Sequence, residues 1–324
     1  MTDKIFFLFP GQGAQCTGMA LDLLESSTRG DGKVKKLFTM ASKITGIDMA
    51  ALLANPDTEN LKKSDISQPA ITLANLSAAA YLEERGIKPS GCAGFSLGEY
   101  AALAVAGLIS EEDCFFLVRE RGKAMQAAAD RIREDETSSP GMAAVLGLSP
   151  EKVEALIGKW RASGKPNSKD IYAANINSPK QTVVSGTAKA LAEAEVLFKT
   201  AGAKRFVRLQ VAGPFHSPLM AEAARKFKPS LEKVQFRNPQ IPLFSNVTGK
   251  RVYSGEEAKK LAMAQITEAV CWTDEEVAIM ASRGIDCLLE AGPGRVLQGL
   301  WKDTNSSLPC YAAGTVADID KLFL

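Results

Sequence analysis

A serine between two glycines and a single histidine are the residues of this chain best suited to nucleophilic chemistry. Ser96 is the centre of the segment GFSLG (94–98), which fits the G-x-S-x-G pattern, where glycines let a strand turn sharply into a helix and expose the hydroxyl. The pattern alone is equally compatible with a plain glycine-rich turn. His216 is the one histidine among 324 residues. It must therefore supply any imidazole base, and a metal site of two or three histidines is excluded.

His216 lies directly before a predicted helix. Ser217 is a good N-cap and Pro218 suits the first helical position, so we expect a helix from there to about Leu231. A base at that place experiences the positive end of the helix dipole, which favours the neutral imidazole. A buried histidine bonded to a backbone carbonyl is the alternative. Because the Ser96 turn otherwise lacks a base, we interpret the two residues as nucleophile and general base.

Arg121 is a candidate binding residue for an anion. A helix is predicted from a Ser110 cap, followed by three acidic residues, to about Ala128. Arg121 lies four residues after Leu117 and four before Met125, so it falls on the apolar stripe of that helix. A guanidinium turned toward the core requires an anion, and its planar shape suits a carboxylate. That carboxylate is either a ligand or an internal partner such as Glu99.

The elements that must position these residues predict an α/β protein. Residues 5–9 are a buried strand that ends at a Pro-Gly loop. A helix is expected over 67–86, with Ser67 as its cap and Pro69 in its first turn, and later strands near 241–244, 286–289 and 309–312. Alternating strands and helices favour a mainly parallel sheet. The segment before Ser96, residues 90–93, is a poor strand by propensity.

The middle of the chain follows a different order. Strands are predicted at 143–148, 171–176, 181–186 and 205–211, with helices at 150–160 and 188–200. This β-α-β-β-α-β order is that of a ferredoxin-like unit, and residues 130–140 are interpreted as the linker into it. We therefore expect an inserted small domain, residues 139–211, within a large α/β domain of residues 1–138 and 212–324.

Composition excludes several classes of function. The 39 Lys and Arg nearly balance the 37 Asp and Glu, so there is no general reason to expect nucleic acid or an anionic membrane as partner. Six scattered cysteines without a C-x-x-C pair favour a reduced, cytoplasmic protein. We find no leader pattern at the first residues and no apolar run long enough to span a bilayer.

Seven segments occur in the order found in malonyl-CoA:acyl carrier protein transacylases, and the chain resembles that family from residue 5 to about 300. The segments are GQGAQ (11–15), GFSLGEY (94–100), RGK (121–123), NINSP (175–179), GPFHSPLM (213–220), SNVTG (245–249) and EAGPG (290–294). The resemblance implies an α/β-hydrolase-like large domain with an inserted ferredoxin-like small domain.

The resemblance also implies a ping-pong transfer. Ser96 would attack malonyl-CoA with His216 as base, and the malonyl-serine would pass its acyl group to the phosphopantetheine thiol of an acyl carrier protein. The backbone N–H groups of Gln12 and Leu97 would form the oxyanion hole. The backbone carbonyl of Gln265, in the segment AQIT (264–267), would orient the histidine.

Further residues gain roles from the same resemblance. Arg121 would grip the free carboxylate of malonyl. Phe215, Asn175 and Asn177 would line the substrate pocket, and the bulk of Phe215 favours malonyl over methylmalonyl. An Asx turn before Pro179 is an equally good interpretation of the two asparagines. The family usually has a histidine where this chain has Phe95. Because the catalytic histidine is the downstream one, we expect Phe95 to alter packing beside the Ser96 turn and to leave the chemistry intact.

The expected partners are malonyl-CoA and an acidic carrier protein, with no metal, no permanently bound cofactor and a monomeric enzyme. Candidate docking residues, equally explained as a solvated charged face, are basic: Lys204, Arg205, Arg208, Arg225, Lys226 and Lys228. A trans-acting acyltransferase of polyketide synthesis and a serine hydrolase of acyl thioesters are the alternatives within the same chemistry. A non-catalytic scaffold would be expected to lack Ser96 or His216, and both are present.

Overall fold

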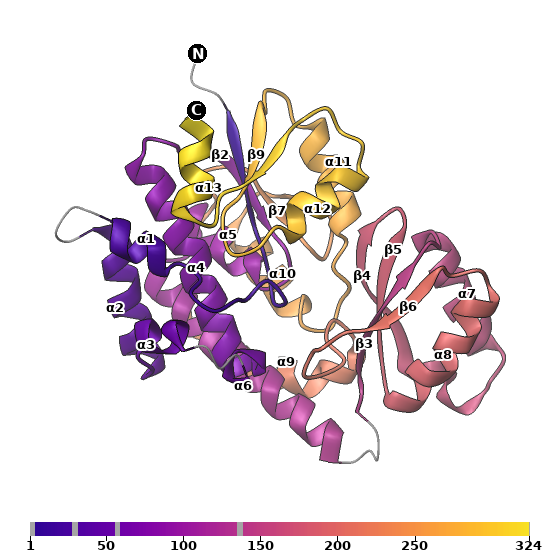
Figure 1. Ribbon diagram of the computed structural model, residues 1–324. Helices are drawn as coiled ribbons and strands as arrows, with labels where there is room; N and C mark the ends of the chain where they lie inside the picture. The colour runs from indigo at the N-terminus through magenta and orange to yellow at the C-terminus, as the bar shows by residue number, and fades with distance from the viewer. Residues whose placement is uncertain (1–3, 28–31, 56–58, 135–138, 324) are drawn as a thin grey trace.

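The structure is a computed structural model that describes residues 4–27, 32–55, 59–134 and 139–323. The described elements form two parts that lie side by side in Figure 1, one around a six-stranded sheet and one around a four-stranded sheet. None of the helices in these residues is long and apolar enough to cross a membrane.

The six-stranded sheet is mainly parallel, which confirms the predicted α/β class. Its strands run in the spatial order β10 (Cys310–Ala312), β9 (Cys287–Glu290), β1 (Ile5–Phe9), β2 (Pro89–Gly94), β7 (Leu243–Ser245) and β8 (Lys250–Val252). Only the β7–β8 pair among these described strands is antiparallel. The central strands β1 and β2 end where Pro10 and Phe95 begin two neighbouring loops, so the loops after them meet at one edge of the sheet.

Helices cover both faces of this sheet. The helices of the large part are α1 (Leu21–Ser26), α2 (Lys33–Thr45), α3 (Met49–Ala54), α4 (Ser64–Glu84), α5 (Gly98–Val105), α6 (Glu111–Glu134), α9 (Ala221–Lys233), α10 (Gly255–Ala264), α11 (Trp272–Ala281), α12 (Val296–Asp303) and α13 (Val316–Asp320). Short 3₁₀ turns are η1 (Asn60–Lys62), η3 (Pro218–Met220) and η4 (Lys321–Phe323). Side chains of β1 alternate: Phe7 and Phe9 join the core beneath α2, α4, α5 and α6, whereas Phe6 and Leu8 pack with α11 and α12.

The smaller part is an antiparallel sheet with helices on one side. Its elements in chain order are β3 (Gly141–Leu146), α7 (Pro150–Ala162), η2 (Pro166–Asp170), β4 (Ile171–Ser178), β5 (Gln181–Gly186), α8 (Ala188–Thr200) and β6 (Arg205–Arg208). The strands lie in the order β4-β5-β3-β6. Apolar residues of α7 and α8 pack on the sheet in a core of their own, separate from the cores of the large part.

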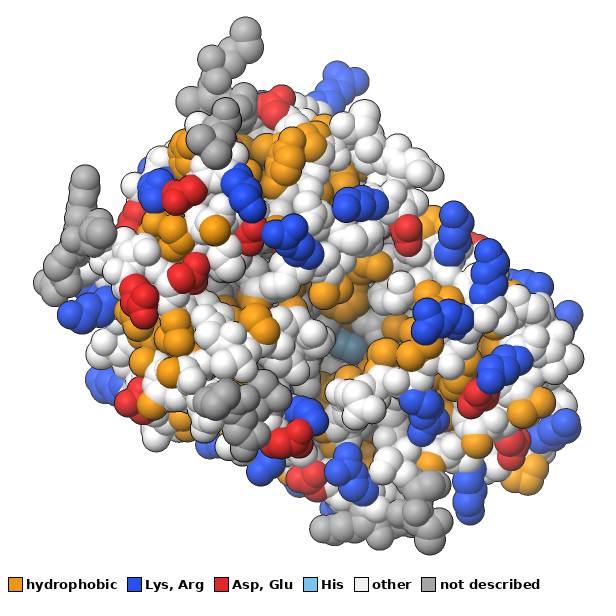
Figure 2. Space-filling view, in the orientation of Figure 1, with side chains coloured by type: hydrophobic (Ala, Val, Ile, Leu, Met, Phe, Trp, Pro, Cys, Tyr) orange, Lys and Arg blue, Asp and Glu red, His pale blue; other side chains and the backbone are white. Residues whose placement is uncertain are grey.

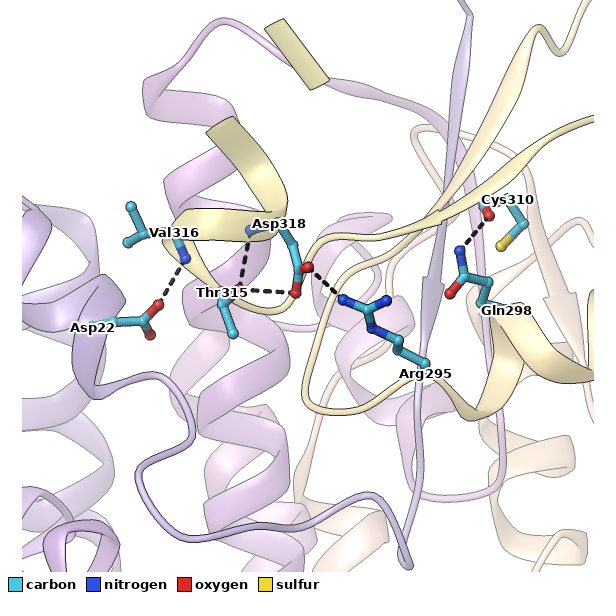
Figure 3. A network of polar contacts seen from close by, with 7 residues as sticks. All are labelled: Asp22, Arg295, Gln298, Cys310, Thr315, Val316 and Asp318. Carbon is cyan, nitrogen blue, oxygen red and sulfur yellow. Dashed lines mark hydrogen bonds and ion pairs between the residues drawn. The ribbon is translucent and has the colours of Figure 1, made fainter. Parts of the chain in front are cut away.

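The C-terminal helix α13 is joined by polar contacts to α1 and to the residue before α12 (Figure 3). The Thr315 hydroxyl accepts from the Asp318 N–H at 3.1 Å and caps this helix, while the Val316 N–H donates to a carboxylate oxygen of Asp22 at 2.7 Å. Arg295 pairs with Asp318 at 2.9 Å. These contacts hold α13 against α1 and against Arg295, which directly precedes α12.

The structure corrects several predicted boundaries. The helix expected from Ser67 begins at Ser64, whose N–H is bonded to the side-chain oxygen of Gln126 at 2.8 Å, so Pro69 lies inside the helix rather than in its first turn. The predicted 130–140 linker is wrong in its first part, because α6 continues to Glu134; residues 135–138 lie outside the described part of the chain. The strand at 205–211 is shorter than expected, and β8 was not predicted.

Candidate active site

The Ser96 turn joins β2 to α5 in a conformation that needs glycine on both sides. Ser96 itself has a φ of 49°, in the left-handed region. A Cβ atom on Gly94 would collide with the backbone of Gly98, and one on Gly98 would collide with the carbonyl of Phe9. The backbone segments of the turn therefore approach each other closely. The strand β2 forms despite its poor propensity because it is held between β1 and β7 in the buried sheet.

Ser96 and His216 lie within hydrogen-bond distance. The Ser96 Oγ is 2.7 Å from Nε2 of His216, and Nδ1 of the same ring is 2.8 Å from the backbone oxygen of Gln265. A carbonyl oxygen only accepts, so Nδ1 carries the proton and Nε2 accepts from the serine hydroxyl. This is the tautomer in which the imidazole can take the serine proton.

Burial keeps His216 neutral. The residue is 5% exposed, and this burial, aided by the nearby Arg121 guanidinium, lowers the pKa of His216 to about 4. Ser217 and Pro218 take the predicted N-cap and first positions, but of a single 3₁₀ turn, η3, and α9 begins only at Ala221. The Ser217 hydroxyl donates to the Pro214 carbonyl at 2.6 Å and does not cap the turn.

Two backbone donors close to the nucleophile are left without a partner. Among the described residues, neither the N–H of Gln12 nor that of Leu97 donates to any protein acceptor. Leu97 precedes the first turn of α5, where N–H groups have no intrahelical acceptor. The loop that carries Gln12 packs directly on the Ser96 turn. The two are so close that a Cβ atom on Gly11 would collide with the Phe95 carbonyl. Free N–H groups in this position can stabilise an oxyanion.

Arg121 is buried without a counter-ion. It is 1% exposed, its Nη1 donates to the side-chain oxygen of Gln68 at 2.9 Å and its Nη2 to that of Gln265 at 3.0 Å. The guanidinium lies over the ring of Tyr100, and its Nε has no partner. The internal ion pair with Glu99 is not formed, and no other described carboxylate pairs with this arginine. A buried cation held by neutral amides still requires an anion.

Gln265 connects the base, the nucleophile and the arginine. Besides the carbonyl that meets His216 and the side-chain oxygen that meets Arg121, its Nε2 donates to the Ser96 carbonyl at 3.0 Å and to Glu99 at 2.5 Å. Burial raises the pKa of Glu99 to about 7, although these donors oppose the shift. The sequence motif implied only the backbone role of Gln265.

Gln68 and Asn75 are site residues that the sequence analysis missed. Both lie on α4, within a series of buried polar side chains on an otherwise apolar helix: Ser64, Ser67, Gln68, Thr72, Asn75 and Ser77. Gln68 contacts Arg121, and Asn75 donates to the Pro10 carbonyl at 2.9 Å in the loop before Gln12. Polar residues repeated inside an apolar helix were the signal that could have pointed to them.

The pocket residues implied by the family resemblance are buried near the junction of the two parts. Asn175 and Asn177 lie within β4, so the Asx-turn interpretation is wrong. Neither amide hydrogen-bonds to the dyad or to Arg121 in the described structure, and the Asn177 Oδ1 has no partner. Phe215 is buried in the main core, and its carbonyl accepts from the Ser185 hydroxyl of β5.

Phe95 fills its position with an aromatic contact. Its ring meets the buried ring of Trp272 edge-on, with 5.4 Å between centroids. Such pairs stabilise a protein by about 1 kcal/mol beyond the area they bury. The side chain beside the nucleophile is therefore fixed by packing rather than by a hydrogen bond.

The single histidine is visible at the base of a hollow between the two parts of the molecule (Figure 2). Basic side chains are exposed on the smaller part beside it. Of the six candidate docking residues, Lys226 and Lys228 pair with acidic neighbours of α9 at 3.0 and 3.8 Å. Lys204, Arg205 and Arg208 are exposed and have no carboxylate partner among the described residues. In the part of the chain that the structure describes, no group of three or more His, Cys, Asp or Glu side chains could hold a metal ion.

Comparison with known proteins places this geometry in a family. Residues 6–320 match the acyl transferase domain family. The chain is 35% identical over 317 residues to the malonyl CoA-acyl carrier protein transacylase of Bacillus subtilis, covering 98% of this chain and 95% of the relative. It is 37% identical over 307 residues to the Escherichia coli K12 protein of the same name, covering 94% of each. A solved complex of a type II polyketide synthase acyl carrier protein with its malonyl-transacylase superposes with a TM-score of 0.88 at 34% identity and covers 98% of both chains.

Proposed function

The chain belongs to the acyl transferase family, among the malonyl-CoA:acyl carrier protein transacylases, and from this premise we propose that it transfers malonyl from malonyl-CoA to the phosphopantetheine thiol of acyl carrier protein. The reaction would supply extender units for fatty acid synthesis. The observation that carries the proposal is Arg121: a buried guanidinium without a counter-ion beside a Ser–His dyad suits an acyl group that carries its own carboxylate.

In the first half-reaction Ser96 becomes acylated. Its Oγ attacks the thioester carbonyl carbon while its proton moves to Nε2 of His216, and the developing oxyanion is bound by the N–H groups of Gln12 and Leu97. Collapse breaks the carbon–sulfur bond, and His216 returns the proton to the leaving CoA thiolate. Gln265 fixes the ring by accepting from Nδ1, which replaces the carboxylate of a triad.

The second half-reaction reverses these steps with a different thiol. The thiol of holo-carrier protein gives its proton to Nε2 of His216 as its sulfur attacks the malonyl-serine. The tetrahedral intermediate collapses with loss of the Ser96 oxygen, which recovers its proton from the histidine. A neutral imidazole is needed at the start of both halves, and the low pKa of His216 supports this cycle.

Arg121 would select the acyl group. Its remaining donor capacity can bind the free carboxylate of malonyl, whereas acetyl would leave the buried charge without an anion. Phe215, Asn175 and Asn177 would complete the pocket, and the bulk of Phe215 would disfavour a 2-methyl group by ~1 to 3 kcal/mol. Phe95 would affect packing beside Ser96 and leave the chemistry unchanged.

The carrier protein would dock on the smaller part. Lys204, Arg205 and Arg208 offer unpaired positive charge for an acidic partner, and the polyketide neighbour was solved with its carrier bound. Arg225, on α9 of the large part, is a further candidate docking residue. Charge reversal at these positions should raise the KM for carrier protein ~5-fold or more, with little change in the KM for malonyl-CoA.

We further infer the domain organisation and setting of the enzyme. The strand order β4-β5-β3-β6 with α7 and α8 supports a ferredoxin-like small domain of residues 139–211. It would be inserted into an α/β-hydrolase-like large domain of residues 1–138 and 212–324. The enzyme would act in the cytoplasm as a monomer, without a permanently bound cofactor.

Intact mass spectrometry tests the proposed function. Mixing the protein with malonyl-CoA should add the mass of one malonyl group, and Ser96→Ala should abolish the adduct. Holo-carrier protein should then remove the adduct and gain the same mass. Release of free malonate at the same rate with and without holo-carrier protein would instead identify a hydrolase, and an adduct that persists in Ser96→Ala would exclude Ser96 as nucleophile.

A further inference from the structure

The roles assigned above leave one sequence segment without a role: SNVTG (245–249), which begins with the last residue of β7 at the same edge of the sheet as the Ser96 turn. Its Asn246 is fully buried beneath that turn. We propose that Asn246 is a positioning residue, whose amide holds the nucleophile turn in its left-handed conformation, and that Glu275 fixes the orientation of that amide.

The amide of Asn246 joins both sides of the nucleophile turn. Its Oδ1 accepts from the backbone N–H of Ser96 at 2.6 Å, and its Nδ2 donates to the carbonyl of Gly94 at 2.7 Å. One side chain therefore bridges the residues before and after Phe95. Ser96 is one of the few described non-glycine residues with a positive φ, a conformation that costs of order 1 kcal/mol or more and persists only where the surroundings impose it.

The amide can be held in only one orientation. The opposite face of Nδ2 donates to Oε1 of Glu275 at 2.6 Å, and Oδ1 also accepts from Nε2 of Gln265 at 3.2 Å. A rotated amide would direct its N–H groups at two donors and its oxygen at two acceptors. Asn246 is also held through its backbone, whose N–H donates to Glu99 and whose carbonyl accepts from Cys271.

Glu275 acts through Asn246 as an acceptor. Burial, together with the nearby Glu99 carboxyl, raises the pKa of Glu275 well above its ordinary value. Its Oε1 is the acceptor for Nδ2 of Asn246, and the side-chain oxygen of a glutamine at the same position would accept in the same way. A leucine of similar size would leave the second Nδ2 proton of Asn246 without a partner.

The arrangement predicts that Asn246 affects the rate of acylation through the position of Ser96. An error of about 1 Å in a reacting group can cost ~100-fold in rate, and Asn246 sets where the Ser96 Oγ lies relative to His216. Because its two shortest side-chain bonds to the turn are to backbone groups and it has no hydrogen bond to Arg121, its loss should lower the rate of acylation and leave malonyl-CoA binding nearly unchanged.

This inference rests on the proposed function, so the experiment first measures malonyl-enzyme formation in the unmodified protein by rapid mixing with malonyl-CoA. Absence of any adduct there would overturn the proposed function. With the adduct present, Asn246→Ala and the isosteric Asn246→Asp are compared over a range of malonyl-CoA concentrations. We expect the acylation rate constant to fall ~100-fold, with the half-saturating concentration changing less than 2-fold.

The variants at Glu275 separate positioning from a general loss of structure. Glu275→Leu should slow acylation ~10-fold or more, whereas Glu275→Gln should lose at most about 3-fold because it keeps the acceptor. Thr248→Ala, an exposed change in the same loop, is the matched control and should behave as the unmodified protein. Circular dichroism confirms that each variant is folded. A folded Asn246→Asp with an unchanged acylation rate, or equal losses in the two Glu275 variants, would overturn the inference.

Discussion

Burial has opposite consequences for charge at the two ends of the site. At the reacting end, formed by Ser96 and His216, burial keeps the histidine neutral and its pKa falls to about 4. At the selecting end, formed by Arg121 and Gln68, an equally buried side chain keeps its charge because a guanidinium does not deprotonate in proteins. Burial removes the proton from the first group and leaves the second in need of an anion.

The difference teaches how one buried volume can serve two tasks. Gln265 touches both ends, through its carbonyl at His216 and its side-chain oxygen at Arg121. Both contacts use neutral oxygens. A carboxylate in either place would raise the pKa of the histidine or satisfy the arginine, and each change would weaken one end. Four changes test this contrast.

The largest effect is expected from removing the base. His216→Ala should lower the rate of malonyl-enzyme formation at least ~10⁴-fold, because no other described side chain can take the Ser96 proton. Stopped-flow acylation with quantification of the adduct measures the rate. The control is an unchanged circular dichroism spectrum. Normal malonyl transfer by this variant would contradict the assignment of the reacting end.

Removing the charge at the selecting end should change preference rather than chemistry. Arg121→Ala should lower kcat/KM for malonyl-CoA ~100- to 1000-fold, the size expected when one partner of a buried ion pair is truncated. Acetyl-CoA, which has no carboxylate, should be used as well as before or better. Competition between the two thioesters gives the ratio directly. An unchanged ratio would show that the arginine does not select the acyl group.

A smaller change supplies the missing carboxylate from within the protein. Gln68→Glu would place an internal anion 2.9 Å from the guanidinium, at the distance of the present hydrogen bond, and compete with the substrate. We expect kcat/KM for malonyl-CoA to fall ~30-fold while acetyl-CoA is little affected. Gln68→Met, which removes the contact without adding charge, is the matched control. Equal losses for both variants would refute the competition.

The smallest effect concerns pH. An ordinary imidazole with pKa 6.5 would be about nine-tenths protonated at pH 5.5, but His216, with its pKa lowered to about 4, stays neutral there. Folding favours the neutral form of the His216 imidazole. Lowering the pH from 7.5 to 5.5 should therefore change the acylation rate constant less than 2-fold. The pH dependence is measured in the Glu99→Gln variant as well, because Glu99, with its pKa raised to about 7, would itself titrate over this range. If the acylation rate of the Glu99→Gln variant fell with an inflection near pH 6.5, the histidine would have an ordinary pKa and a more exposed environment.

The sequence predicted the elements that local pattern determines. The mainly parallel sheet, the strand at β1 and the span of α8 follow from apolar periodicity and turn residues. Ser96 was identified from the G-x-S-x-G pattern, His216 because it is the one histidine of the chain, and Arg121 because it falls on the apolar stripe of a helix.

What the sequence did not predict depends on contacts between distant segments. The strand β2 is held by its neighbours on both sides, and the start of α4 is fixed by Gln126 on another helix. The neutral state of His216 comes from burial by elements far away in the chain. Gln68 and Asn246 were missed because an amide becomes informative only when its partners are known.

The hydrogen bond from His216 to the Gln265 carbonyl has a spectroscopic consequence. Because the chain has one histidine, uniform ¹⁵N labelling of histidine gives a single pair of ring signals that needs no assignment. A protonated Nδ1 and an unprotonated Nε2 have well-separated nitrogen shifts, so the spectrum reports the tautomer directly. Acylation of Ser96 removes the proton donor at Nε2 and leaves Nδ1 bonded, and the two signals should therefore respond unequally to each half of the reaction.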